Sequence, residues 1–231
     1  MSELTYKMLP LPAVFLMEAQ LPKELVEILN KYLDKLLKNK ERKTASDTLV
    51  GQIHSGQQLT IDYKLKELDE IRAAFCSIAA KYVSEFLMLT GQSISGNRRI
   101  DIDNIWSVHS YAGDYNPLHD HGTKTAMGVS CTTWTKIPKQ ISALPDPSEG
   151  EFDYFNSSGC SDGFLEFSFG KNSVIDKERL KPTEAVVCKP KVGTIYFFPS
   201  WLQHTVYPFR GEGERRTVAA NFNCFPLEDN E

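Results

Sequence analysis

The stretch GTIYFFPSWLQHTVY, residues 193–207, decides the fold class. Its first part, Gly193 to Phe198, is an apolar run of β-branched and aromatic side chains, which is typical of a buried strand. A proline and a serine then interrupt the run, and Thr205 to Tyr207 resume it directly after His204. The stretch therefore predicts two short strands with a histidine at the start of the second.

Other short β-like runs surround this stretch, separated by turn-forming segments such as Arg210-Gly211-Glu212-Gly213. Short strands between turn signals indicate a β-sandwich or a jelly roll. With the helical pattern of the first part, they predict an α+β fold, a β-roll buttressed by N-terminal helices. The expected strands are Ile100–Tyr111, Ala126–Trp134, Gly163–Phe169, Ala185–Cys188, Gly193–Phe198, His204–Tyr207 and Thr217–Phe225.

The chain before Gly91 has a different pattern. An entering strand is expected over Leu9–Glu18, followed by a helix that starts near Pro22 and a second helix over Leu65–Leu89. Between the helices, Thr44–Asp62 is expected to be a loop with a short strand. No linker-like composition separates the parts, so residues 1–231 are expected to form one domain, with 1–95 as mainly helical support and 96–226 as the jelly-roll core.

The composition is that of a soluble globular protein, with 41% hydrophobic and 24% charged residues. A net charge of −4 gives no footprint for nucleic acid or an anionic membrane, so nucleic acid is not the expected partner. No apolar run approaches the roughly 20 residues that span a bilayer, and prolines interrupt the apolar N-terminal stretch, which argues against a signal peptide. The five cysteines are scattered without a Cys-x-x-Cys spacing, which predicts reduced thiols and a cytoplasmic location.

Three of the five histidines fall in two segments, and they are the candidate catalytic residues. His119 and His121 are two residues apart, so on an extended segment they point to the same side. His204, arriving from a distant strand, can close a three-ligand metal site with open positions, which suits iron(II). Zinc is the competing metal, because three histidines and a water also form a catalytic zinc site.

An arginine follows His204 by twelve residues, at the start of an alternating strand pattern. If Val218, Ala220 and Phe222 face inward, Arg216 enters the same interior. A buried guanidinium there needs an anion, ideally a carboxylate bound through two hydrogen bonds. The neighbouring Arg215 is then the natural candidate for a surface salt bridge. A carboxylate clamp beside a metal is what an oxygenase using a keto acid requires.

The chain resembles the iron(II)/2-oxoglutarate-dependent dioxygenases over roughly Ile100–Phe225, and in particular a subgroup with Asn-Pro-x-His-x-His and Phe-Pro-Ser-Trp-Leu-x-His segments. The resemblance implies an α+β fold whose β-roll is a double-stranded β-helix (jelly roll, cupin-like) buttressed by N-terminal helices. It implies hydroxylation of an unidentified substrate, with release of succinate and CO2. It also implies iron(II) near His119 and His204, and 2-oxoglutarate as co-substrate with its distal carboxylate on Arg216. The segments that carry the likeness are Trp106, Gly113–His121, Gly128-Val129, Phe198–Pro208 and Arg216–Asn223.

The sequence departs from the usual pattern of that family at one position. The family places a carboxylate two residues after the first histidine, where this chain has His121. Three ligand sets therefore remain open: His119, His121 and His204 together; Asp120 as the carboxylate through a local bulge; or a single upstream histidine with His204 and water.

Further expectations concern the co-substrate, the substrate and the competing functions. Tyr111, Asn116 and Tyr196 are candidates to bind 2-oxoglutarate, and the long polar loop 136–162 is a candidate cover for the mouth of the roll. The substrate is expected to be a small molecule or a peptide, not a membrane, and the oligomeric state stays open. The alternatives are a keto-acid-independent cupin-type metalloenzyme and a non-enzymatic β-roll binding module.

Overall fold

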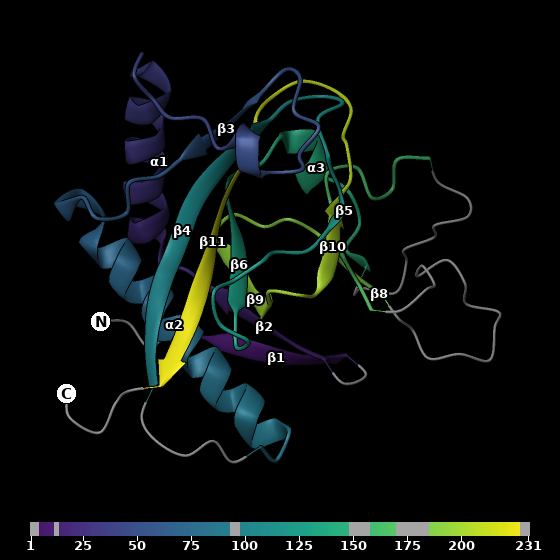
Figure 1. The fold of residues 1–231 in the computed structure, drawn as a ribbon. Helices are drawn as coiled ribbons and strands as arrows, with labels where there is room; N and C mark the ends of the chain where they lie inside the picture. The colour runs from purple at the N-terminus through teal and green to yellow at the C-terminus, as the bar shows by residue number, and fades with distance from the viewer. Residues whose placement is uncertain (1–4, 12–13, 93–97, 148–157, 170–184, 227–231) are drawn as a thin grey trace.

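The computed structural model describes residues 5–11, 14–92, 98–147, 158–169 and 185–226. Two antiparallel sheets face each other, and two long helices cover the outer side of the larger sheet (Figure 1). This is the expected α+β jelly roll with a helical buttress. No helix within the described parts of the chain is long and apolar enough to cross a membrane.

The larger sheet contains strands from both halves of the chain. Its order across the sheet is β1 (Tyr6–Leu11), β2 (Val14–Gln20), β9 (Thr194–Pro199), β6 (Val129–Lys136), β11 (Arg215–Pro226), β4 (Arg98–Ser110) and β3 (Gln57–Thr60). The single strand expected over 9–18 is instead the β1–β2 hairpin. The N-terminal 95 residues therefore supply three strands of this sheet in addition to their helices.

The smaller sheet carries two of the three candidate histidines. Its order is β5 (Asn116–His119), β10 (Gln203–Val206), β7 (Leu165–Ser168) and β8 (Ala185–Cys188). The pairing of the edge strand β5 with β10 sets His119 directly across from His204. β5 was not among the predicted strands, because it is short and contains Pro117.

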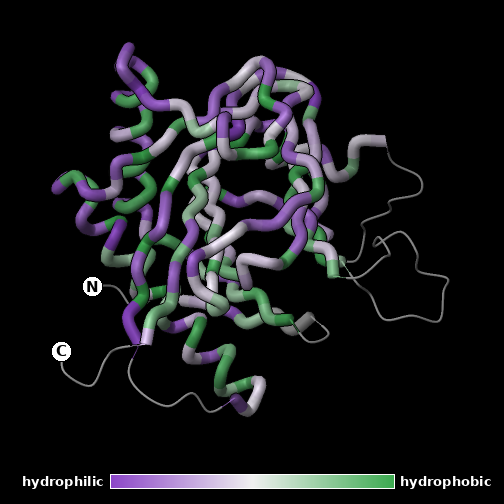
Figure 2. Tube along the Cα trace, in the orientation of Figure 1, coloured by the Kyte–Doolittle hydropathy of each residue, from purple (hydrophilic) through white to green (hydrophobic). Residues whose placement is uncertain are grey.

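The two helices form where the sequence places apolar residues at helical spacing. Helix α1 (Lys23–Lys38) follows Pro22 and ends at Asn39, and helix α2 (Asp69–Leu89) follows a 3-10 turn over Lys66–Leu68. Hydrophobic and hydrophilic residues alternate along both helices in Figure 2, as expected when one face of a helix packs on a sheet. Their apolar faces meet the sheet in one continuous core, in which Phe75 and Phe222 are both fully buried.

The large sheet therefore has two buried faces. On β11, Val218, Ala220 and Phe222 belong to the core under the helices, whereas Thr217 and Ala219 face the space between the two sheets. A short helix, α3 (Lys139–Ser142), closes one end of the roll and packs through Ile141 on Phe164 and Phe209. The candidate site lies between the sheets.

Candidate metal and keto-acid site

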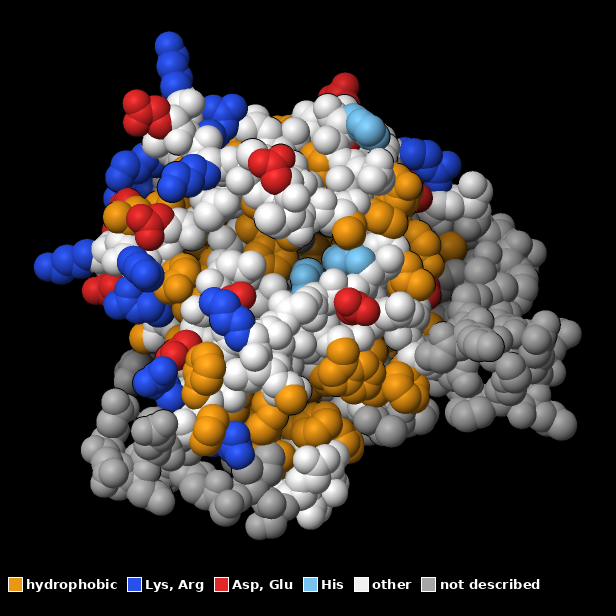
Figure 3. Space-filling model, in the orientation of Figure 1, with side chains coloured by type: hydrophobic (Ala, Val, Ile, Leu, Met, Phe, Trp, Pro, Cys, Tyr) orange, Lys and Arg blue, Asp and Glu red, His pale blue; other side chains and the backbone are white. Residues whose placement is uncertain are grey.

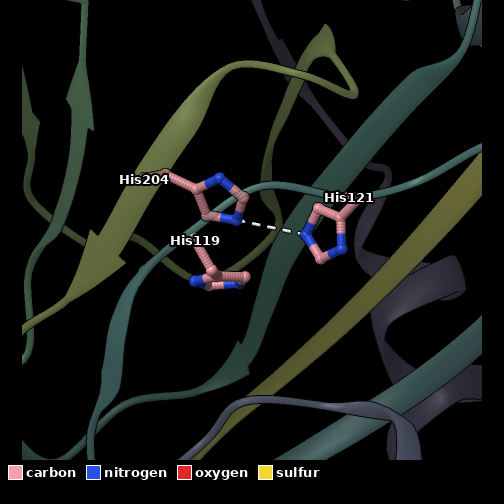
Figure 4. A group of neighbouring side chains, drawn as sticks. All are labelled: His119, His121 and His204. Atoms are coloured by element: carbon pink, nitrogen blue, oxygen red, sulfur yellow. Dashed lines mark hydrogen bonds between the residues drawn. The ribbon is translucent and has the colours of Figure 1, made fainter.

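The three histidines predicted from the sequence converge in space. His119 ends β5, His121 follows two residues later, and His204 lies on β10. Their side chains point toward one another (Figure 4), and one nitrogen of each lies within 4.8 Å of the other two. Asp120 is not part of this group. Among the described residues, the arrangement corresponds to the three-histidine ligand set.

Hydrogen bonds to the backbone orient two of the imidazoles. His119 donates from Nδ1 to the carbonyl of Pro117 at 2.7 Å, and His204 donates from Nδ1 to the carbonyl of Leu202 at 3.0 Å. Each bond places the proton on Nδ1 and leaves the Nε2 lone pair free for a metal. His121 Nε2 lies 3.2 Å from His204 Nε2. Nitrogen donors gathered so closely suit a cation between them.

Burial keeps the three imidazoles neutral, as metal ligands must be. Burial and, to a lesser extent, the nearby His119 lower the pKa of His121 to about 4. Burial also lowers the pKa of His119, although the bond to Pro117 and the charge of Asp120 act in the opposite direction. The pKa of His204 is held well below its usual value by the same burial and by both neighbouring histidines.

The backbone around His121 is fixed by a tightly packed turn. The His121 amide donates to the carbonyl of Ser200 at 2.8 Å, and the Ser200 amide donates to the carbonyl of Gly128 at 3.0 Å. A Cβ at Gly128 would lie 1.8 Å from Thr123 Oγ1, so only glycine allows this approach. The segment before His204 therefore also holds His121 in place.

The histidines open into a cavity between the sheets whose walls are mostly apolar. In Figure 3 two histidine side chains are visible in a hollow with apolar side chains beside it. The lining residues are Leu49, Val50, Trp106, Val108, Asn116, His119, His121, Cys131, Thr132, Trp134, Leu165, Phe198, His204, Val206, Arg215, Thr217 and Ala219. Apolar walls exclude water, which strengthens the electrostatic interactions of the few polar groups inside.

The guanidinium in this cavity belongs to Arg215, which corrects the prediction for Arg216. Arg215 is 1% exposed and donates from Nη1 to the carbonyl of Gly163 at 3.0 Å. Its Nε has no acceptor among the described residues. Burial lowers the pKa of Arg215 to about 10, and the charge of Asp114 only partly offsets it. An anion in the cavity would relieve this cost.

A second unpaired donor lies next to Arg215. Trp134 lines the cavity and is 1% exposed, and its Nε1 has no acceptor within the described part of the chain. Trp134 is paired across the strands with Thr217, whose side chain shares a face with that of Arg215. Diagonal neighbours of this kind are within reach of long side chains. The two donors together suit a carboxylate.

Arg216 points to the opposite face of β11, toward helix α1. Its Nε and Nη2 donate to the two carboxylate oxygens of Glu214 at 2.8 and 3.0 Å, and Nη2 also donates to Asp34 at 2.8 Å. Its Nη1 donates to the side chain of Asn30 at 3.1 Å. The side chain is thus satisfied by its own protein and does not reach the cavity.

The other residues predicted for the site also divide into those that line the cavity and those that do not. Asn116 lines the cavity as expected. Tyr196 does not, because its hydroxyl donates to Glu18 at 2.6 Å, and Tyr111 is 39% exposed outside the lining. No described residue of the loop 136–162 lines the cavity; residues 148–157 of it lie outside the described residues. The wall is formed instead by Leu49 and Val50 of the earlier loop.

Comparison with known proteins agrees with this geometry. Residues 104–221, about half of the chain, match the family model described as "Putative 2OG-Fe(II) oxygenase". No curated protein matches the chain.

Several solved structures share the fold. A prolyl-4-hydroxylase from Pseudomonas putida aligns with a TM-score of 0.54 and 14% identity, covering 90% of this chain and 91% of that one. The non-haem α-ketoglutarate-dependent epimerase SnoN from nogalamycin biosynthesis aligns with a TM-score of 0.55 and 11% identity, covering 94% of this chain and 82% of that one. A prolyl hydroxylase from Trichoplax adhaerens aligns with a TM-score of 0.53 and 12% identity, covering 90% of this chain and 82% of that one. At these identities the likeness establishes the fold alone.

Proposed function

The chain belongs to the 2OG-Fe(II) oxygenase family and is an iron(II)- and 2-oxoglutarate-dependent oxygenase, and we propose that it hydroxylates its substrate at a three-histidine iron centre with Arg215 as the keto-acid clamp. The overall reaction consumes 2-oxoglutarate, dioxygen and a substrate C–H bond, and yields succinate, carbon dioxide and the hydroxylated product. Iron(II) supplies the chemistry that couples these two oxidations.

The observation that carries the proposal is the pairing of two features in one cavity. A neutral set of nitrogen ligands leaves the full charge of the metal uncompensated. A buried guanidinium with an unpaired Nε lies in the same cavity. Both features attract a dianionic keto acid, whose distal carboxylate would bind Arg215 and Trp134 while its other end lies toward the histidines.

The residues of this chain have distinct roles in that scheme. His119, His121 and His204 hold iron(II), and the carbonyls of Pro117 and Leu202 fix which nitrogen faces the metal. Phe198 packs edge-on against His204 at 4.9 Å between ring centres and limits rotation of the imidazole. Asn116 lies in the lining as a hydrogen-bonding group for either the keto acid or the substrate.

The proposal includes a cytoplasmic location. All five cysteines are unpaired in the structure, and four of them are buried. Free buried thiols are typical of a reducing compartment.

The direct test is to incubate the iron-loaded protein with 2-oxoglutarate and oxygen and to measure succinate. Succinate formation above that of the metal-free protein is expected even without a substrate, because many such sites turn over slowly when uncoupled. If iron-loaded protein neither binds 2-oxoglutarate nor forms succinate, the proposal is wrong.

Substitutions distinguish His121 from Asp120 as a metal ligand. His121→Ala is expected to reduce the iron content of purified protein at least about tenfold, because it removes one of three ligands, whereas Asp120→Ala should leave iron content close to the wild type. Iron is measured by elemental analysis, which does not depend on turnover. The reverse pattern would assign the carboxylate of Asp120 to the metal.

A further inference from the structure

We propose that the substrate is a polypeptide, and that a large apolar side chain of it binds in a groove beside Trp201 while the residue to be oxidised enters the histidine cavity. This inference rests on the proposed function, which it extends from the reaction to the class of substrate.

The groove lies between the end of helix α2 and the turn after β9. Its volume is about 270 Å³, close to the lower end of the range for small-molecule sites, and most of its lining is apolar. The side chains that form it include Tyr82, Phe86, Leu87, Met127, Pro199 and Trp201. In Figure 3 apolar side chains gather below the histidine hollow, over the lower part of the large sheet.

Trp201 is the exposed member of this groove. Half of its surface is open to solvent, whereas Trp106 and Trp134 are 6% and 1% exposed. Val50, which lines the cavity, and Leu118, which precedes His119, are also exposed, at 46% and 53%. The histidine cavity and the groove therefore each have a large exposed apolar side chain in their lining, Val50 and Trp201, and such side chains indicate surfaces that are covered when a partner binds.

The groove is joined to the metal ligands by one short segment. Pro199 and Trp201 line the groove, and Ser200 between them accepts the hydrogen bond from the His121 amide. One residue beyond Trp201, the Leu202 carbonyl accepts the bond from His204. A ligand that presses on Trp201 therefore contacts the segment that positions two of the three histidines.

The separation of the two hollows favours a polypeptide over a lipid. Ser200 links the two hollows, because it lies between two residues of the groove and accepts the hydrogen bond from the His121 amide, and its hydroxyl is 3.3 Å from that of Thr123. A continuous hydrocarbon tail would have to cross these polar groups without satisfying them. A polypeptide places apolar side chains at intervals along a hydrogen-bonding backbone. The exposed Gln92 at the edge of the groove offers that backbone a partner.

The charge of the site argues against nucleic acid. The only lysine or arginine among the residues lining the cavity is Arg215, which the keto acid occupies in the proposed function, and the other ionisable side chains there are the three histidines and the buried thiol of Cys131. None of the residues lining the groove is ionisable apart from Tyr82, whose hydroxyl donates to the carbonyl of Phe15. Binding of a phosphate backbone needs lysine and arginine contacts that neither surface provides.

The test uses the iron(II)- and 2-oxoglutarate-loaded protein without oxygen, and follows quenching of tryptophan fluorescence by acrylamide. Because Trp201 is the exposed tryptophan, quenching reports on the groove. The probes are pools of twelve-residue peptides, each with one fixed phenylalanine, leucine or aspartate, and vesicles of phosphatidylcholine. Pools with fixed phenylalanine or leucine are expected to protect Trp201, and the aspartate pool and the vesicles are not. Admitting oxygen should then add one oxygen atom to peptides of the protecting pools.

Variants separate the groove from general folding effects. Trp201→Ala is expected to raise KM for the oxidised peptides at least about tenfold with a smaller change in kcat, as for an aromatic anchor, and Trp201→Phe should restore most of the affinity. Leu65→Ala, which truncates another exposed apolar residue outside the lining of both hollows, should change neither constant.

Several outcomes would overturn the inference without touching the reaction. Protection of Trp201 by vesicles but by no peptide pool would assign a lipid instead. If peptides are oxidised while the quenching of Trp201 is unchanged, the substrate does not bind in the groove. The same conclusion follows if no probe protects Trp201 while succinate still forms from 2-oxoglutarate. Absence of succinate under all conditions would contradict the proposed function itself.

Discussion

Arg215 and Arg216 are neighbours on one strand, yet their surroundings differ in nearly every respect. Both are almost fully buried, at 1% and 3% exposure. Arg216 is bound by two carboxylates and an amide, and although burial alone would lower its pKa, its bonds to Glu214 and Asp34 raise it. Arg215 has one backbone acceptor, an unpaired Nε and a lowered pKa.

The difference distinguishes a structural charge from a functional one. Glu214, Arg216 and Asp34 form an ion-pair network that joins the start of β11 to helix α1, and His109 and Lys136 complete the bonds of Glu214. A satisfied network of this kind contributes to a fixed structure. A buried charge left without an anion destabilises the protein, and proteins retain such a group where a ligand supplies the missing partner.

The largest expected effect on stability comes from breaking the Arg216 network. Arg216→Met should lower the free energy of unfolding by about 3–5 kcal/mol, because it leaves the buried Glu214 without its main partner. Urea unfolding of the metal-free protein, followed by circular dichroism, measures this loss. Arg216→Met combined with Glu214→Gln is the matched control and should recover part of it. A loss below about 1 kcal/mol for the single variant would show that the network contributes little.

The pH dependence of stability should be a smaller effect with a defined sign. Burial alone would raise the pKa of Glu214, but hydrogen bonds from His109, Arg216 and Lys136 outweigh it and hold the pKa well below its usual value. A carboxyl whose pKa is lower in the folded state stabilises the protein above the unfolded pKa of about 4.3, and this contribution is lost as pH falls toward the folded value.

Unfolding of the wild type and Glu214→Gln, measured from pH 7 to pH 3, tests that sign. The difference in stability between them should be constant above about pH 5 and should shrink below the usual carboxyl pKa. A difference that grows on acidification would mean that Glu214 is not the stabilised carboxylate.

The smallest change in stability is expected for Arg215. Arg215→Met removes a buried charge that lacks an anion and keeps much of its volume, so the free energy of unfolding should stay within about 1 kcal/mol of the wild type or rise. The measurement is the same urea titration, again without metal or 2-oxoglutarate. A loss as large as that of Arg216→Met would show that both arginines are structural.

The comparison also explains where sequence reasoning succeeded and where it failed. The spacing of His119 and His121 and the strand before His204 were sufficient to predict the histidine group, because strand geometry fixes which residues share a side. The fold class followed from strands and turns in the same way. The prediction for Arg216 depended on a further assumption, that the apolar face of β11 is the face that contains the site.

That assumption failed because the strand is buried on both faces. Every residue from Glu214 to Cys224 is buried, and the apolar set Val218, Ala220 and Phe222 packs under the helices. An alternating pattern distinguishes the two faces of a strand. It does not show which face packs under the helices and which faces the space between the two sheets. Trp134 was missed for a related reason, because a tryptophan in a predicted strand is ordinarily interpreted as a core residue. Its unpaired Nε1 is visible only in three dimensions.

The most direct test of the central claim is a calorimetric titration of 2-oxoglutarate, without oxygen, into iron(II)-loaded Arg215→Met and Arg216→Met proteins beside the wild type. Arg215→Met is expected to weaken binding about 100-fold, the loss of roughly 3 kcal/mol that follows removal of a buried charged partner. Arg216→Met should bind within about threefold of the wild type if it is folded. Equal losses in both proteins, or a loss confined to Arg216→Met, would contradict the assignment of Arg215 as the residue that binds the keto acid.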